Sequence, residues 1–159
     1  MTTNDVRLRP VRDDDLEFFL AYEHDPEAVR RSRFTPRPRE AFLRHWRERV
    51  LGEPTGLVRT VLVDGEVAGS IVAWWDEERR FTGYWLGRAY WAQGVGSRAL
   101  ALFLQEETVR PLYADTSAEN TASVRLLEKS GFVAAGAEHE VDEGYVLLVL
   151  HGDSTAEAP

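Results

Sequence analysis

A glycine-rich segment in the middle of the chain has the residue types that bind a phosphate group. Residues 83–97 have the sequence GYWLGRAYWAQGVGS, in which an apolar stretch is followed by Gly94, Gly96 and Ser97. Glycines let the backbone turn tightly and bring its N–H groups close to a ligand. Where such a turn opens a helix, unpaired N–H groups and the positive end of the helix dipole favour an anion. A glycine turn also commonly just caps a helix, so the spacing alone leaves both interpretations open.

Two other phosphate-binding loops fit this segment less well. The chain contains no Gly-x-x-x-x-Gly-Lys-Ser/Thr sequence, the loop of nucleoside triphosphatases. A dinucleotide-binding loop needs a third glycine at position 99, which is Ala99 here. Such a loop also follows the first strand of a parallel sheet, whereas this segment follows a predicted antiparallel meander.

The other reactive residue types limit the chemistry. The chain has no cysteine, which excludes disulfides, thiolate nucleophiles and cysteine-based metal sites. Any thioester chemistry would therefore need the sulfur of a cofactor. The four histidines show no metal-ligand spacing, so we expect no metal; they are His24, His45, His139 and His151.

Hydrophobic spacing and turn residues predict the elements that position this segment. A helix capped by Asp13 or Asp14 ends at Pro26, Arg30 to Pro38 form a loop, and a second helix follows. Asp64-Gly65 predicts a hairpin. The expected strands lie at 6–10, 57–63, 67–75, 81–86, 112–116, 133–141 and 145–150, and the later helices at 94–107 and 120–130. A strand–helix–strand unit after an antiparallel meander predicts the α/β class, with helices packed on a mixed sheet.

Four sequence blocks, in this order, resemble the GCN5-related N-acetyltransferase (GNAT) superfamily. They resemble most closely its ribosomal-protein-alanine acetyltransferase branch, the RimJ/RimL-like proteins. The resemblance covers roughly residues 5–151. It implies a mostly antiparallel central sheet with a splayed strand pair and flanking helices. The blocks are RLRPVRDDDL at 7–16, GYWLG at 83–87, WAQGVG at 91–96, and Asn120-x-x-Ser123 through Glu128-Lys-Ser-Gly-Phe132.

The resemblance implies acetyl-CoA as co-substrate and a role for each matching position. The backbone N–H groups of Gln93, Gly94, Val95, Gly96 and Ser97 would bind the coenzyme A pyrophosphate. The strand edge at Trp85, Leu86 and Gly87 would pair with the pantetheine arm. Asn120 would hydrogen-bond the pantetheine, although Asn is also a favoured helix N-cap. Ser123 would lie near the thioester sulfur.

Two departures from the superfamily pattern bear on catalysis. Trp91 takes a position that is commonly Arg or Gln, as in the alanine-acetyltransferase branch. Leu127 stands where many members place a tyrosine acid, which leaves Ser123 as the candidate acid. The strand at 81–86 has no carboxylate, so the candidates for the base are Asp76, Glu77 and Glu23. Asp76 and Glu77 also fit a solvated turn.

The function expected from these residues is transfer of an acetyl group from acetyl-CoA to a primary amine, by direct attack in a ternary complex. A backbone N–H near Leu86 would stabilise the oxyanion. The acceptor would be a small-molecule amine or a protein N-terminal amine. Two alternatives stay open: a non-catalytic acyl-CoA sensor of the same fold, and a nucleotide-binding protein that uses the Gly94 loop.

Length and composition set the remaining expectations. The 159 residues, 43% of them hydrophobic, fit one folded domain over 1–152 with a small polar tail at 153–159. The net charge of −8 argues against nucleic-acid binding. No signal-like or membrane-length apolar run is visible, so we expect a cytoplasmic protein that does not bind membranes. It would be a monomer or a homodimer.

Overall fold

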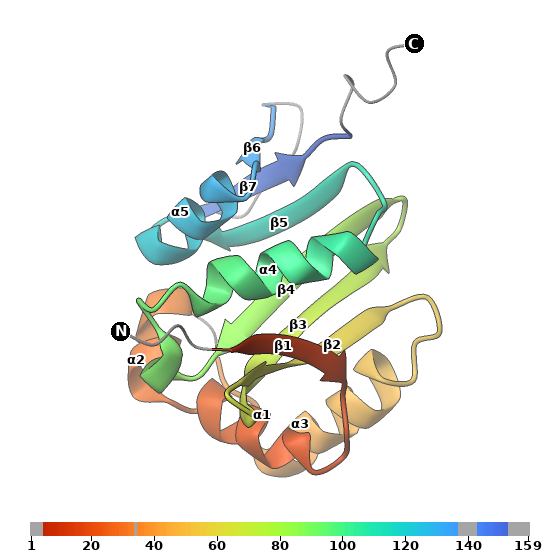
Figure 1. The fold of residues 1–159 in the computed structure, drawn as a ribbon, viewed down its shortest axis with the longest axis vertical. Coiled ribbons are helices and arrows are strands. Elements are labelled where there is room, and N and C mark those ends of the chain that lie inside the picture. The colour runs from red at the N-terminus through yellow and green to blue at the C-terminus, as the bar shows by residue number, and fades with distance from the viewer. Residues whose placement is uncertain (1–4, 34, 137–142, 153–159) are drawn as a thin grey trace.

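The computed structural model describes residues 5–33, 35–136 and 143–152, and it shows one mixed sheet with helices on both faces (Figure 1). The strand order is β1-β2-β3-β4-β5-β7-β6. All neighbouring strands are antiparallel except β4 and β5, which are parallel. The strands are β1 (Val6–Pro10), β2 (Leu57–Val63), β3 (Glu66–Asp76), β4 (Arg79–Leu86), β5 (Leu112–Ser117), β6 (Val133–Ala134) and β7 (Tyr145–Leu150). The mixed, mostly antiparallel fold that the sequence predicts is therefore confirmed.

In the described residues, five α-helices, one π-helical segment and one 3-10 turn connect these strands. Helix α3 continues directly into a π-helical segment, and a 3-10 turn follows β4. The helices are α1 (Asp15–Glu23), α2 (Pro26–Ser32), α3 (Arg39–Arg44), η1 (His45–Val50), η2 (Arg88–Tyr90), α4 (Val95–Glu106) and α5 (Thr121–Lys129).

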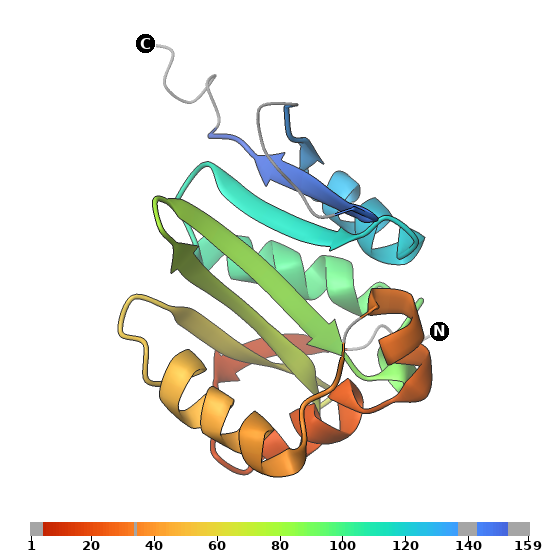
Figure 2. The same ribbon diagram turned by 180° about the vertical axis from the view of Figure 1, so that it is seen from behind.

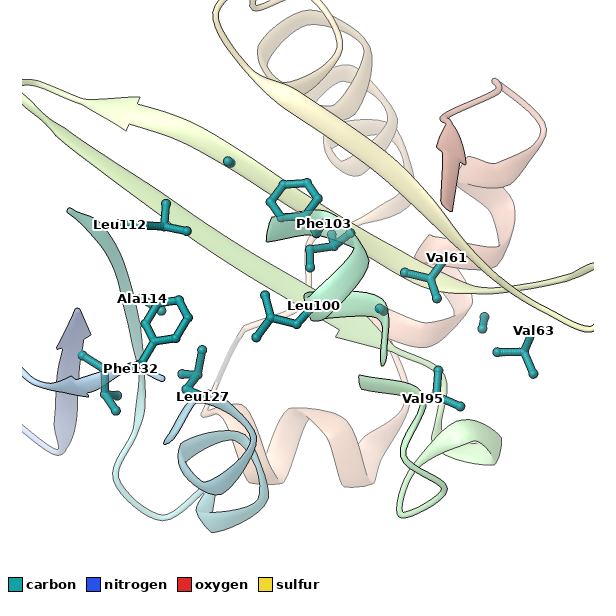
Figure 3. Close-up of a cluster of buried hydrophobic side chains, with 14 residues drawn as sticks. Val61, Val63, Val95, Leu100, Phe103, Leu112, Ala114, Leu127 and Phe132 are labelled. Atoms are coloured by element: carbon teal, nitrogen blue, oxygen red, sulfur yellow. The ribbon is translucent and has the colours of Figure 1, made fainter. Parts of the chain in front are cut away.

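The two faces of the sheet bury separate hydrophobic cores. On one face, Leu100 and Phe103 of α4 pack with Leu127 of α5 against strand residues such as Val61 and Leu112 (Figure 3). On the other face, α1, α3 and η1 cover β2 and β3 with a smaller cluster made of Leu16, Phe19, Phe42 and Trp46 (Figure 2).

The segment after Pro26 is the main difference from the predicted elements. Helix α1 ends at Glu23, before Pro26 as expected, but Pro26 also begins α2, and Arg30 to Ser32 are helical instead of part of a loop. The Asp25 side chain caps this helix by accepting from the Glu27 N–H (2.9 Å). A proline at the first helical position lacks only an N–H that would be unpaired anyway. The same residue can therefore stop one helix and start the next.

Two smaller expectations also change. Asp14 is the N-cap residue of α1 but makes no side-chain cap bond; instead the Asp15 carboxylate accepts from the Arg12 N–H (2.8 Å). Within the described part of the strand expected at 133–141, only Val133–Ala134 is strand, as β6. Positions 137–141, like the tail predicted at 153–159, lie outside the described residues.

Candidate active site

The strands β4 and β5 separate along their length. They pair only at Arg80–Leu112 and Phe81–Tyr113, although β4 continues to Leu86 and β5 to Ser117. Figure 2 shows the two strands diverging towards their carboxyl ends. The open end of the pair therefore faces the glycine-rich loop that follows β4.

A buried ion pair fixes the closed end of this split. The Arg80 guanidinium donates to Glu107 Oε1 through Nε (3.0 Å) and Nη2 (2.7 Å), and to the Thr55 carbonyl through Nη1 (2.8 Å). Both charged side chains are almost fully buried. Since Arg80 lies on β4 and Glu107 follows α4, the pair holds the end of the helix against the sheet. Removal of either partner would leave an uncompensated buried charge.

The loop after β4 presents the start of α4 at the open end. Gly94, the N-cap residue of α4, has a φ of +76°, and no side chain caps the helix. The first N–H groups of a helix have no acceptor within it. A Cβ atom on Gly94 would meet nothing closer than the Arg98 guanidinium at 4.0 Å. The uncapped helix start and the open space beside it fit a bound diphosphate.

Two other glycines of the predicted cofactor site serve close packing instead. A Cβ atom on Gly96 would lie 2.3 Å from Leu126 of α5, and one on Gly87 would lie 2.6 Å from the Tyr22 ring. A larger residue at 96 would push against the Leu126 side chain and disturb the packing of α4 on α5, so a Gly96→Trp change would affect the fold as well as any bound cofactor.

Arg98 is a candidate binding residue that the sequence analysis missed. Its guanidinium donates to the carbonyls of Gln93 (3.2 Å) and Gly94 (3.3 Å), which places a positive charge beside the helix start. Its position one turn into the predicted helix was the available signal. A cation at this place would add to the helix dipole in attracting a diphosphate.

Asn120 and Ser123 lie together at the start of α5. The Asn120 side chain caps the helix, because its Oδ1 accepts from the Ser123 N–H (3.3 Å). Its amide NH₂ group is not needed for this cap. The two interpretations left open for Asn120, N-cap and coenzyme contact, are therefore compatible.

Tyr84 of β4 lies against the start of α5, a contact that the sequence alone did not reveal. Its hydroxyl oxygen lies 2.6 Å from Ser123 Oγ and 3.4 Å from the Ser123 carbonyl oxygen. Burial raises the pKa of the Tyr84 hydroxyl to about 12, and the Ser123 hydrogen bond opposes that rise only in part. Strand alternation predicts that either Tyr84 or Trp85 faces the cleft. The structure turns Tyr84 towards α5 and Trp85 towards α1, where Trp85 Nε1 donates to the Tyr22 carbonyl (2.9 Å).

Helix α2 is attached to the same loop from the other side. The Arg88 side chain in η2 pairs with Asp25, the N-cap residue of α2. The Arg31 guanidinium lies over the Trp91 ring, 4.5 Å from its centroid. These contacts hold α2 beside the open end of the strand pair, where Figure 2 shows it next to the ends of β4 and β5.

The carboxylates predicted as candidate bases are separated by the fold. Asp76 pairs with Arg79 at the start of β4, and Glu77 follows in the turn, both exposed. Five residues of strand, about 17 Å, separate Arg79 from Tyr84. Asp76 and Glu77 are thus at the end of β4 far from Ser123, a placement that gives no support to a catalytic role for either.

Glu23 has a different environment at the end of α1. It is buried, and its carboxylate accepts from the Arg37 N–H (3.0 Å). Burial raises the pKa of Glu23, although the Arg37 N–H lowers it in part. The preceding residue, Tyr22, packs against Gly87, and its carbonyl accepts from Trp85 Nε1, so the end of α1 lies beside the carboxyl end of β4.

The described part of the chain has neither a metal-ligand cluster nor a membrane-spanning helix. Within residues 5–33, 35–136 and 143–152, no group of three or more His, Asp or Glu side chains is arranged to hold a metal ion. No helix among the same residues is long and apolar enough to cross a membrane.

Solved structures share this fold. An aminoglycoside acetyltransferase in complex with coenzyme A is 19% identical, with a TM-score of 0.74, 92% of this chain covered and 95% of the other. RimJ from Mycobacterium smegmatis, in complex with CoA-disulfide, is 22% identical (TM-score 0.72; 92% and 81% covered). RimL, a ribosomal L7/L12 alpha-N-protein acetyltransferase, is 18% identical (TM-score 0.72; 94% and 91% covered).

Comparison of sequences decides the family. No curated protein matches the chain significantly. The sequence profile of the family described as "Acetyltransferase (GNAT) domain" matches residues 5–133, which is most of the chain and includes the split strands, the glycine-rich loop and α5. The chain therefore belongs to the GNAT acetyltransferases, in the RimJ/RimL-type family, as the sequence blocks predict.

Proposed function

We propose that this protein transfers an acetyl group from acetyl-CoA to a primary amine, by direct attack of the amine on the thioester in a ternary complex. One observation carries the proposal: the uncapped start of α4 and the Ser123 hydroxyl both adjoin the open end of the split strands. Gly96 of α4 packs on Leu126 of α5, one helical turn from Ser123, which connects the two parts. The absence of cysteine leaves no thiolate to carry the acetyl group.

The donor half of the site would hold coenzyme A along the split. The N–H groups of Gln93 to Ser97, with the Arg98 charge beside them, suit a diphosphate. Beyond Phe81, β4 no longer pairs with β5, and this edge suits an extended pantetheine arm, since such an arm can pair as an added strand does. The Asn120 amide NH₂ group suits a carbonyl acceptor on that arm. The coenzyme-bound GNAT relatives support this assignment.

Three groups would assist the transfer. A backbone N–H near Leu86 would stabilise the oxyanion of the tetrahedral intermediate. Ser123 would supply a proton to the departing sulfur. Glu23 is the carboxylate with an environment suited to accept a proton from the incoming ammonium, because burial raises its pKa above that of an exposed glutamate. Positioning of both substrates would provide much of the acceleration.

The acceptor would be an amine on a small molecule or at a protein N-terminus. RimL acts on a ribosomal protein, and the relative in complex with coenzyme A is an aminoglycoside acetyltransferase. Both acceptor classes carry a primary amine, and the net charge of −8 is compatible with a cationic substrate. Helix α2 and the segment to Arg37 would form the acceptor wall, since Arg37 contacts Glu23, Ser32 of α2 contacts Tyr145 of β7, and α2 lies next to the ends of β4 and β5 (Figure 2).

A release assay for free coenzyme A tests this function. Thiol should appear when the protein and acetyl-CoA are mixed with at least one of three amines: a peptide with N-terminal alanine, an aminoglycoside or a polyamine. Mass spectrometry should find the acceptor heavier by one acetyl group. If none of these three amines leads to release of thiol, the proposal is contradicted.

The sensor alternative has one observation in its favour. Leu127, at the position where many GNAT members have a tyrosine acid, is a core residue that is only 1% exposed and cannot serve as an acid. A protein that binds acetyl-CoA tightly but releases no thiol, and whose binding is unchanged by Ser123→Ala, would be such a sensor.

A further inference from the structure

We propose that Tyr84 is a positioning residue for the transfer: its hydroxyl donates a hydrogen bond to Ser123 Oγ and turns the Ser123 proton towards the departing sulfur. This inference rests on the proposed function and names a residue for the same site. The hydrogen bond between Tyr84 and Ser123 joins the split strand β4 to the first turn of α5.

The geometry of the pair is well defined. The two hydroxyl oxygens are 2.6 Å apart although the residues are 39 positions apart in the sequence. The Tyr84 ring packs against the main hydrophobic core, which fixes the direction of its hydroxyl. Tyr84 also lies three residues beyond Phe81, the last residue of β4 that pairs with β5. The pair is therefore at the opening of the split.

Counting hydrogen-bond groups explains what Tyr84 does to Ser123. A serine hydroxyl has one proton and two lone pairs. The Ser123 N–H is engaged by Asn120 Oδ1, and the Tyr84 hydroxyl is close to both oxygens of Ser123. When Tyr84 donates to Oγ, it occupies one lone pair and the Ser123 proton must point elsewhere. One donor and one lone pair of Ser123 then remain for the reacting groups.

The proton balance gives Ser123 and Tyr84 different parts. Burial raises the pKa of Tyr84 to about 12, so Tyr84 keeps its proton and remains a hydrogen-bond donor at neutral pH. The C–N bond forms and the C–S bond breaks. In the same step the Ser123 proton passes to sulfur and the acetylated nitrogen gives a proton to Ser123 Oγ, so that no serine alkoxide has to form.

A double-mutant cycle tests this assignment, with acetyl-CoA and the most active amine of the panel. Ser123→Ala should lower kcat by about 10²-fold, within the range for loss of a proton-transfer group. Tyr84→Phe should lower kcat by about 10-fold and leave both KM values and the calorimetric Kd for coenzyme A within about 2-fold. In the Ser123→Ala background, Tyr84→Phe should lower kcat by less than about 2-fold, because the hydrogen-bond partner of Tyr84 is already absent.

Thr82→Val is the matched control. Thr82 lies on the same strand, and its hydroxyl donates to the Val72 carbonyl (2.8 Å), away from Ser123. This variant should keep wild-type kcat. If Tyr84→Phe lowers kcat by the same factor in the wild type and in Ser123→Ala, the inference is overturned. It is also overturned if Thr82→Val lowers kcat as much as Tyr84→Phe does.

A second readout separates failure of this inference from failure of the proposed function. Urea unfolding of the same four proteins measures the Tyr84–Ser123 coupling without any turnover. A wild-type protein that releases no thiol would overturn the proposed function and the positioning role together, even with coupling in unfolding. If the wild type turns over but neither kcat nor urea unfolding shows coupling between Tyr84 and Ser123, this inference alone is overturned.

Discussion

At the scale of single residues, three glycines of the predicted cofactor site have different physical reasons to be glycine. Gly94 adopts a positive φ with open space beside it. Gly87 and Gly96 instead leave no room for a Cβ atom, because Tyr22 and Leu126 occupy that space. A ligand can therefore approach the backbone at Gly94, whereas the other two glycines let secondary-structure elements pack closely.

Gly94 is accordingly the residue at which to test whether the start of α4 binds the diphosphate. We expect Gly94→Trp to weaken coenzyme A binding by at least ~10-fold, since the indole would cover the helix start. Gly65→Trp is the matched control, because Gly65 also has a positive φ (+85°) and open space but lies in the β2–β3 turn. Both variants should lose about 1–3 kcal/mol of stability from backbone strain. Calorimetric titration with coenzyme A should distinguish the two variants. Equal affinities would refute a diphosphate site at the start of α4.

At the scale of elements, the start of α5 combines a helix cap with a candidate ligand contact. Asn120 Oδ1 closes the first turn of the helix, and Ser123 in that turn reaches Tyr84 on β4. The α4 start, in contrast, has no side-chain cap. The first turn of α5 is thus capped by a side chain, whereas that of α4 is not.

Two substitutions of Asn120 separate its two roles. Asn120→Ser keeps a good N-cap oxygen but loses the amide NH₂ group, so stability should stay near wild type while coenzyme A affinity falls several-fold. Asn120→Ala should lose about 1 kcal/mol of stability in addition. Thermal unfolding and calorimetric titration measure the two effects. If Asn120→Ser binds coenzyme A as the wild type does, Asn120 is only a cap.

At the scale of the whole molecule, one buried carboxylate joins the edge of the sheet to α1. Asp15, at the start of α1, accepts from Arg9 of β1 at 2.7 and 2.9 Å and from Thr60 of β2 at 2.7 Å. Burial alone would raise the pKa of Asp15. The bonds from Arg9, the Arg12 N–H and Thr60 outweigh burial and lower the pKa to about 2.

This shift makes stability depend on pH in a defined direction. Since the folded pKa lies below the unfolded value of 3.8, the ionised carboxylate contributes about 2 kcal/mol above pH ~5 and loses that contribution as the pH falls towards 2. Asp15→Asn should therefore be less stable than wild type at pH 7, and the difference in urea unfolding should shrink as the pH falls. The control Asp13→Asn removes an exposed carboxylate that pairs with Arg47 and should change little. If the stability difference between Asp15→Asn and the wild type is the same at every pH, the stabilising role of the ionised Asp15 carboxylate is contradicted.

The sequence by itself determined the features that depend on neighbouring residues. The β2 and β7 bounds, the Asp64-Gly65 turn, the glycine loop and the helix that begins after Asn120 all follow from local spacing and turn chemistry. Local signals misled at Pro26, because a proline suits a helix start as well as a stop. The four ordered sequence blocks also sufficed to predict the family, because their spacing reflects the order of the elements.

Only the tertiary structure decided which of these residues meet. The Tyr84–Ser123 pair, the Leu126 contact that requires Gly96, and the burial of Glu23 join segments separated by about 14 to 39 residues. Asp76 and Glu77 lie close to β4 in sequence, yet the antiparallel register places them at its far end. Such contacts depend on strand register and helix packing, which one sequence does not encode in any local pattern.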